Sequence, residues 1–371
     1  MDNKILGWSI AVIAVAIVIV LIAVFSGTKG EETIKIGVVA PMSGALGMYG
    51  NSSAAALEYA AEKMGNEIDG KKIEFIPEDG KCDAAEASKV FNKLVNVDGV
   101  KYIMGGFCSG ETLTGAPVVE AAKVILISPA SSSPDVRSAG EYVFTLYPLD
   151  DFGSNFSADF IYNTLGVRKV AIIYGLNDYT KGMKDYFTKS FEALGGKVVI
   201  AESNEANATD FKVQLTKVAA TDAELLFIAD YPAELGNVLT QTSTMGLNIT
   251  LYVQEQLTPA FVADHKDLVE GVYGSRVVTV LEDSNFETVI KAKSGLTEID
   301  ALYSSIAYDG LFMLKQAIEK VGNDPEKVKD ALVGMEYSGI SGTIKLDKDG
   351  VPEKANFKIE KVVNGELVEQ K

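Results

Sequence analysis

The sequence predicts an α/β fold whose sheets are parallel and covered by helices. Short runs of apolar and β-branched residues alternate along the chain with longer stretches that have helical periodicity. Most of these runs are apolar throughout, which is typical of parallel strands buried on both faces. A chain of 371 residues is long enough for two domains with separate cores. Ligands of such sheets bind beyond the carboxyl ends of the strands, so we expect function in the loops there.

Strands and helices are predicted in alternation along most of the chain. The predicted strands are residues 34–40, 72–77, 102–106, 124–128, 169–174, 197–201, 225–229 and 250–253. The predicted helices are residues 52–64, 84–96, 111–122, 181–194, 211–219 and 233–245. Alternation of this kind is expected where crossover helices join parallel strands.

The N-terminal segment predicts the subcellular localisation. The chain is largely apolar from Ile5 to Phe25, and 21 residues at about 1.5 Å each cover roughly 32 Å, enough to cross a hydrocarbon core. Lys4 precedes this run, so the positive-inside rule sends everything after it out of the cytoplasm. We expect residues 1–30 to form an uncleaved signal-anchor, a transmembrane helix with a short polar linker. The alternative is a long signal peptide cleaved near Ser26.

The balance of charges bears on the kind of partner. The chain has 51 Asp and Glu against 34 Lys and Arg, a net charge of −17. Binding to a nucleic-acid backbone requires clustered Lys and Arg, so we expect no nucleic-acid partner.

Residues that carry catalysis or bind metals are scarce. The one histidine, His265, lies in a polar stretch where we expect a solvated surface position. With Cys82 and Cys108 as the two cysteines, the chain has too few His and Cys ligands for an ordinary zinc site. No Gly-x-Ser-x-Gly motif is present. We therefore expect a protein that is not an enzyme and that holds no metal and no cofactor.

Three loops that follow predicted strands are rich in Gly and Ser. They are residues 41–50, 107–111 and 129–134. Such loops let backbone N–H groups face a ligand, and a loop that opens a helix adds the positive end of the helix dipole. This composition suits a carboxylate, although ordinary caps and turns have the same composition. A phosphate site is less favoured, because neither a Walker motif nor Gly-x-Gly-x-x-Gly follows the first strand.

Five motifs in order carry a resemblance to a known family. They are Ile34-Lys35-Ile36-Gly37-Val38-Val39-Ala40-Pro41-Met42-Ser43-Gly44, Tyr49-Gly50, Glu78-Asp79 before Cys82-Asp83, Gly105-Gly106-Phe107-Cys108-Ser109, and Ser128-Pro129-Ala130-Ser131-Ser132. From about Thr33 almost to its C-terminus, the chain resembles the branched-chain (Leu/Ile/Val) amino-acid binding proteins of ABC importers. These are type I periplasmic binding proteins.

The resemblance implies two α/β lobes that are joined by three crossovers and close on a ligand. The first lobe would hold residues 33–148 plus 279–341, and the second residues 149–278 plus 342–371. The implied function is extracytoplasmic capture of a free amino acid, most favourably branched-chain or otherwise hydrophobic. A monomer anchored to the membrane would deliver it to an ABC permease.

The same resemblance assigns the polar ligand contacts. Ser109 and Ser132 match the positions that hold the ligand α-carboxylate, and the carbonyl of Ala130 matches the contact to its α-ammonium. Glu255 matches the acidic partner of that ammonium, with Gln254 as the alternative in register. A counter-charge is needed there, because burying an unpaired ammonium is costly.

Aromatic residues match the wall around the ligand side chain. They are Tyr49, Phe107, Tyr179, Tyr231 and Tyr303, and Cys108 and Ser131 complete the implied ligand set. Apolar residues with a few polar anchors are usual in small-ligand pockets. The sequence departs from the branched-chain pattern by having Ser131 and Ser132, where a small apolar residue and Thr are common. A polar or aromatic amino acid therefore stays open.

A disulfide and a second functional interpretation complete the expectations. Cys82 and Cys108 match a bridge of the family, and disulfides persist outside the cell; two reduced, buried cysteines are the alternative. The same fold also serves in ligand-sensing receptor domains for an amide, urea or related small molecule. Such sensors usually carry a further signalling module.

Overall fold

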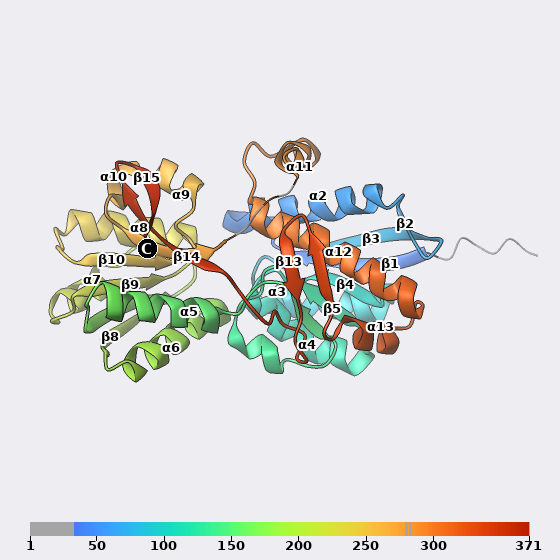
Figure 1. Ribbon diagram of the computed structural model, residues 1–371, viewed down its shortest axis with the longest axis horizontal. Coiled ribbons are helices and arrows are strands. Elements are labelled where there is room, and N and C mark those ends of the chain that lie inside the picture. The colour runs from blue at the N-terminus through green and yellow to red at the C-terminus, as the bar shows by residue number, and fades with distance from the viewer. Residues whose placement is uncertain (1–32, 279–280, 282, 371) are drawn as a thin grey trace, which may run out of the picture.

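The computed structural model describes residues 33–278, 281 and 283–370, and these form two lobes side by side (Figure 1). The predicted two-lobed α/β fold is confirmed. The predicted signal-anchor of residues 1–30 lies outside the described residues. Within the described ranges, no helix is both long and apolar enough to cross a membrane.

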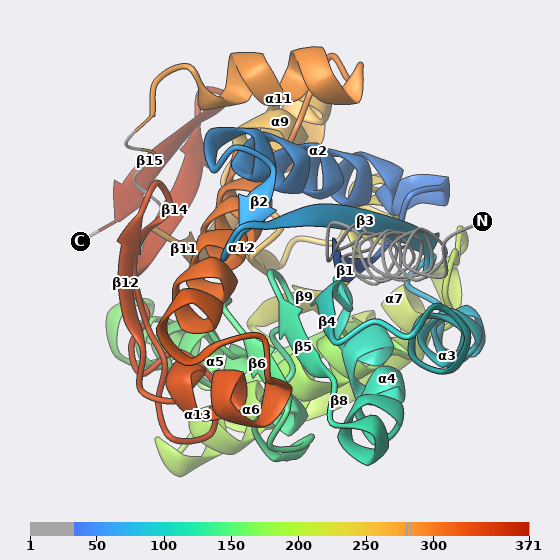
Figure 2. The same cartoon turned by 90° about the vertical axis from the view of Figure 1, so that its right-hand side faces the viewer.

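The first lobe is built on a six-stranded sheet in the order β2-β3-β1-β4-β5-β6. Its strands are β1 (Thr33–Ala40), β2 (Glu67–Ile68), β3 (Lys71–Asp79), β4 (Tyr102–Gly105), β5 (Ile125–Ser128) and β6 (Val143–Thr145). Its helices are α2 (Gly47–Lys63), α3 (Ala84–Lys93), α4 (Ser109–Ala122), α11 (Phe286–Ser294), α12 (Ala301–Val321) and α13 (Pro325–Leu332). Helices α2 and α12 cover one face of the sheet, and α3 and α4 cover the other (Figure 2).

The second lobe is built on a seven-stranded sheet in the order β15-β14-β11-β10-β9-β7-β8. Its strands are β7 (Lys169–Gly175), β8 (Lys197–Asn204), β9 (Leu225–Ala229), β10 (Thr250–Gln254), β11 (Tyr273–Val277), β14 (Phe357–Val363) and β15 (Glu366–Gln370). Its helices are α5 (Asp150–Asp159), α6 (Asp178–Ala193), α7 (Lys212–Ala219), α8 (Pro232–Thr244), α9 (Pro259–Asp264) and α10 (Lys266–Val269). Helices α5 and α6 cover one face, and α7, α8 and α9 cover the other.

Antiparallel strands at the sheet edges differ from the predicted all-parallel sheets. β2 pairs with β3 across Asp69-Gly70, and β14 pairs with β15 across Asn364-Gly365. All four turn residues have positive φ. Asx-Gly pairs favour two-residue turns of this kind, and such turns reverse the chain directly instead of through a helix. The central strands are parallel, as predicted.

Helix starts also differ from the sequence prediction, whereas strand positions agree closely. Helix α2 begins at Gly47 rather than at residue 52. The sequence suggested a loop there because Gly47 and Gly50 are residues that loops favour. Gly50 packs so closely against the backbone of Pro41 that a Cβ at this position would lie 2.0 Å from the Pro41 carbonyl oxygen. The helix therefore runs past the loop that follows β1 and brings Tyr49 to the lobe interface.

The chain crosses between the lobes after β6, after β11 and again after the hairpin of β12 (Glu336–Gly339) and β13 (Gly342–Lys345). The predicted lobe boundary between residues 341 and 342 falls inside this hairpin. Ile344, Leu346 and Val351 are buried in the core of the first lobe. Their apolar side chains keep the chain with the first lobe to about residue 352.

Candidate ligand site between the lobes

A cavity lies between the lobes, beyond the carboxyl ends of strands from both sheets. The predicted site residues that line it are Tyr49, Phe107, Cys108, Ser109, Ala130, Ser132, Tyr179, Tyr231, Glu255 and Tyr303. The structure thus brings together residues that are up to 254 positions apart, from Tyr49 to Tyr303. Ser131 is the predicted residue that does not reach the cavity.

Ser109 lines the cavity on the side of the first lobe and opens helix α4. The N–H groups of a first helical turn have no acceptor within the helix, and the helix dipole makes this end positive. The Ser109 hydroxyl oxygen accepts hydrogen bonds from the N–H groups of Ser132, at 3.2 Å, and Ser133, at 3.1 Å. These bonds tie the loop after β5 to the start of α4. Because both of these bonds use the oxygen as acceptor, the hydroxyl proton of Ser109 is not needed for either of them.

Ser132 lies beside Ser109, but its hydroxyl already has a partner. It donates to Asp150 at 3.0 Å, and the N–H of Asp150 donates to the carbonyl of Ser132 at 2.7 Å. Burial, followed by the nearby charge of Glu255, holds the pKa of the Asp150 carboxyl well above its usual range. Asp150 is the first residue of α5, so this contact joins the lobes at the first crossing.

Ser131 fixes the loop from behind the cavity wall. Its hydroxyl donates to the carbonyl of Gly106 at 2.8 Å and lies 2.6 Å from the hydroxyl of Thr112. Its N–H donates to the hydroxyl of Ser128 at 2.9 Å. The polar residue at this position therefore serves the loop and does not alter the cavity lining.

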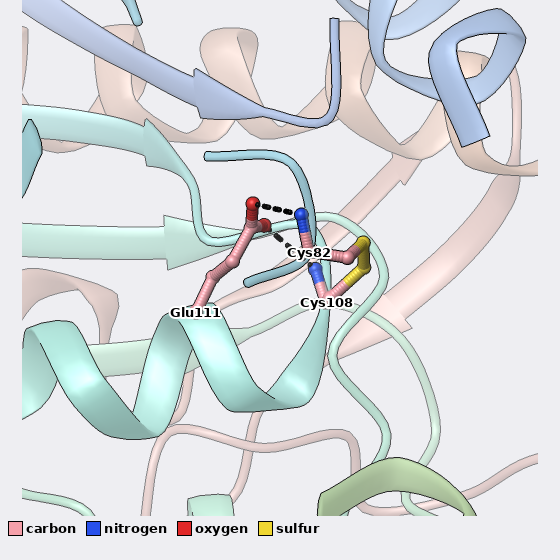
Figure 3. A group of neighbouring side chains, drawn as sticks. All are labelled: Cys82, Cys108 and Glu111. Carbon is pink, nitrogen blue, oxygen red and sulfur yellow. Dashed lines mark hydrogen bonds between the residues drawn. A yellow bond between two sulfur atoms is a disulfide. The ribbon is translucent and has the colours of Figure 1, made fainter. Parts of the chain in front are cut away.

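A disulfide and a buried carboxylate lie beside the start of α4, next to Ser109 (Figure 3). Cys82 and Cys108 form the predicted bridge, with their Cα atoms 5.4 Å apart. The carboxylate of Glu111 accepts the N–H groups of both cysteines, each at 3.0 Å. Burial raises the pKa of Glu111 to about 7, against the lowering effect of these two bonds. The sulfur atoms are bonded to each other, so this group offers no thiolate to a metal ion.

Glu255 lines the cavity on the side of the second lobe and provides its carboxylate. It follows β10 with a φ of +71°, and its N–H donates to the carbonyl of Ser275 on β11 at 2.7 Å. The side chain is 7% exposed, and its carboxylate accepts a hydrogen bond from the hydroxyl of Tyr147. Burial raises the pKa of Glu255 to about 7, while the bond from Tyr147 and the charge of Arg276 act in the lowering direction.

The alternative register at Gln254 points away from the cavity. Gln254 is buried, and its side-chain oxygen accepts a hydrogen bond from Ser157 of α5 at 3.3 Å. The next residue but one, Gln256, does line the cavity and donates to the hydroxyl of Tyr179 at 3.2 Å. The chain direction at the end of β10 thus presents Glu255 and Gln256 to a ligand.

Aromatic rings form the remaining wall in two groups. In the first lobe, Tyr303 lies centrally, with ring centroids 5.9 Å from Tyr49, 5.2 Å from Phe107 and 5.3 Å from Tyr147. In the second lobe, Tyr179 and Tyr231 lie 5.5 Å apart. Packed rings of this kind give a rigid, largely apolar wall with hydroxyl groups at its edge.

Four cavity residues were not predicted from the sequence: Leu46, Tyr147, Pro232 and Gln256. Leu46 belongs to a loop that the sequence singled out, and Gln256 lies beside Glu255. Tyr147 follows the short strand β6, which the apolar patterns did not reveal. The rule that sites follow strand ends would have found it once β6 was known.

His265 differs from its predicted solvated position. It is half-buried, its Nδ1 lies 3.0 Å from the carbonyl oxygen of Phe261, and its ring stacks on Phe261 with centroids 4.2 Å apart. Stacking on the preceding turn of α9 removes part of the ring from water.

Comparisons with known proteins agree on the family. A model of the periplasmic binding protein family matches residues 33–361. The chain is 27% identical over 331 residues to the leucine-, isoleucine-, valine-, threonine- and alanine-binding protein of Pseudomonas aeruginosa, covering 88% of each chain. A leucine-binding protein of Thermotoga maritima superimposes with a TM-score of 0.80 at 24% identity, covering 91% of this chain and 98% of that one.

A ligand-bound structure gives a similar match. The substrate-binding protein of a branched-chain amino-acid transporter from Streptococcus pneumoniae, solved with isoleucine, has a TM-score of 0.77 at 25% identity. The match covers 91% of this chain and all of that one. With the family model extending over nearly all of the described chain, this protein belongs to the periplasmic binding protein family, as its motifs predicted.

Proposed function

We propose that this protein captures a free amino acid outside the cytoplasm and delivers it to an ABC permease. The observation that carries the proposal is the pairing of helix-end donors at Ser109 with the buried carboxylate of Glu255 across one cavity. An α-amino acid carries a carboxylate and an ammonium that match these two ends. The amino-acid names of the relatives support the same ligand class.

In the proposed pose, the ligand carboxylate accepts from the N–H and hydroxyl of Ser109, with Ser132 beside it. The ammonium lies between the carbonyl of Ala130 and the carboxylate of Glu255. The side chain rests among the rings of the two aromatic groups, which favours a hydrophobic amino acid such as leucine. Binding and release complete the cycle, and no covalent step is part of the proposal.

Closure of the lobes supplies the mechanism. The ligand docks first on Ser109, Ala130 and Ser132 of the first lobe. Rotation about the three crossings then brings Tyr179, Tyr231 and Glu255 of the second lobe over it. For this motion we propose a first lobe of residues 33–148, 281 and 283–352, with the remaining described residues in the second lobe.

The site of action follows from the N-terminal sequence. We propose that residues 5–25 anchor the protein to the membrane, with both lobes outside and acting as a monomer. Mass spectrometry of the N-terminus of the protein purified from membranes distinguishes an intact anchor from a cleaved one. An N-terminus near residue 27 would reject the anchor.

Isothermal titration of the purified protein with each of the twenty amino acids tests the ligand class. We expect heat with leucine, isoleucine or valine and none with 4-methylpentanoate, which is leucine without its amino group. Absence of binding for all twenty amino acids would reject the proposed function. Equal binding of leucine and 4-methylpentanoate would reject the ammonium contact alone.

A further inference from the structure

Tyr147 connects the two lobes at the ligand cavity. It follows β6 at the end of the first sheet, whereas Glu255 follows β10 in the second sheet. The Tyr147 hydroxyl donates a hydrogen bond to Oε2 of Glu255. Tyr147 is 2% exposed, so this contact is shielded from water. A hydroxyl from the first crossing thus contacts Glu255, which is the one carboxylate among the described residues that line the cavity.

The contact leaves the two carboxylate oxygens of Glu255 in different situations. Oε2 is taken by Tyr147, whereas no residue in the described part of the chain donates a hydrogen bond to Oε1. The backbone of Glu255 is fixed through Ser275, and the ring of Tyr147 packs on Tyr303. Glu255 is therefore held by the second lobe, and Tyr147 by the first lobe.

We propose that Tyr147 is a positioning residue for the ligand: it holds Oε2 of Glu255 so that Oε1 is presented to the α-ammonium. This inference rests on the proposed function, because it takes the ammonium as the group that Glu255 receives. A positioned carboxylate loses less entropy when it pairs with a cation than a freely rotating one.

The same hydrogen bond favours the charged form of Glu255, because a hydroxyl donates better to a carboxylate than to a neutral acid. The other ionisable groups that face Glu255 come from several elements. They are Arg276 on β11, Asp300 before α12, Asp150 on α5, Tyr179 on α6, Tyr252 on β10 and Tyr303 on α12. Arg276 already pairs with Glu360, which also contacts Lys358. Tyr147, and none of these six groups, donates the side-chain hydrogen bond to Glu255.

Tyr147→Phe removes one oxygen atom and keeps the ring, so it tests the hydrogen bond directly. A hydrogen bond to a charged group corresponds to about one to two pH units. We therefore expect leucine affinity to fall about tenfold or more at pH 6 and less than about threefold at pH 9. Isothermal titration of the full chain in detergent over this range measures the change. A Tyr147→Phe profile that runs parallel to the wild-type profile would overturn the proposal.

Tyr179→Phe is the matched control. It removes the same atom from a neighbouring wall residue, but the Tyr179 hydroxyl is bonded to the amide of Gln256 and not to the carboxylate. Its effect on affinity should be the same factor at every pH. A pH-dependent loss equal to that of Tyr147→Phe would contradict a specific role for Tyr147.

A ligand-free measurement separates this inference from the proposed function. Carboxyl ¹³C titration of glutamate-labelled protein reports the pKa of Glu255, with Glu255→Gln identifying its signal. Tyr147→Phe should raise that pKa by about one unit or more. An unchanged pKa overturns the role of Tyr147 even if leucine binds. A raised pKa in a protein that binds no amino acid rejects the proposed function and supports the hydrogen bond's effect on Glu255.

Discussion

The two polar ends of the cavity use different physical means to meet opposite charges. At Ser109, the start of α4 would offer neutral donors to the proposed ligand, and a disulfide and Glu111 lie behind them. At Glu255, a single side chain supplies a full charge, and its neighbours come from both lobes. Several neutral donors divide the binding free energy among them, whereas no other group can replace a single charge. Loss of one group should therefore weaken the first end slightly and the second end severely.

Glu255→Ala gives the largest expected effect. Removing one partner of a buried charge pair costs about 3 to 5 kcal/mol, which is more than a hundredfold in affinity. Isothermal titration with leucine measures it. Glu255→Gln is the control for shape, and it should lose nearly as much because it keeps the volume and removes the charge. Retention of affinity in Glu255→Gln would mean that the site does not use this charge.

The disulfide lies next to Ser109 and should matter for stability. The bridge closes a loop with a sequence separation of 26 residues, which corresponds to about 3 to 4 kcal/mol in the chain-entropy model. We expect the double variant Cys82→Ala, Cys108→Ala to lose free energy of unfolding by that amount in urea titrations. A loss confined to leucine affinity, with stability unchanged, would show that the bridge shapes the site without stabilising the fold.

The dependence on pH distinguishes the two ends in the unaltered protein. With a pKa of about 7, the Glu255 carboxyl is protonated below that pH and loses the charge that the ammonium requires. Leucine affinity should therefore fall about tenfold between pH 8 and pH 6. Titrations in buffers of different ionisation enthalpy should also show proton release on binding near pH 6. A flat profile would place the pKa of Glu255 well below 6 in the free protein.

Ser109→Ala should have the smallest of these effects. It removes a hydroxyl and leaves the N–H groups of α4, so the expected loss is about 1 kcal/mol, or roughly fivefold in leucine affinity. Part of this loss comes from the N–H groups of Ser132 and Ser133, which lose their acceptor. A loss as large as that of Glu255→Ala would contradict the comparison between the two ends.

The sequence predicted the regular part of this fold well, because parallel strands are apolar runs with clear boundaries. Strand 225–229 agrees residue for residue with β9. The short strand β6 was not predicted, because three residues are too few to show a pattern. The edge hairpin β14–β15 was not predicted, because its strands mix polar with apolar residues. The Asn364-Gly365 pair was an available turn signal.

The candidate site was predicted through family motifs more than through residue chemistry. Motifs placed Ser109, Glu255 and the aromatic residues, and the structure brings them to one cavity. They could not show that Ser131 faces Gly106 or that Ser132 is bonded to Asp150. Those contacts depend on side-chain direction and on residues from other loops, which spacing along a chain does not encode.

The C-terminal hairpin has a consequence for the order in which the protein is assembled. All six strands of the first sheet lie between residues 33 and 145, whereas the second sheet needs β14 and β15 from residues 357–370. Until those residues leave the ribosome, β11 has an unpaired edge. Glu255 is anchored to β11 through Ser275. During synthesis, the part of the cavity around Ser109 can thus form early, and the part around Glu255 becomes complete only when the last strands arrive.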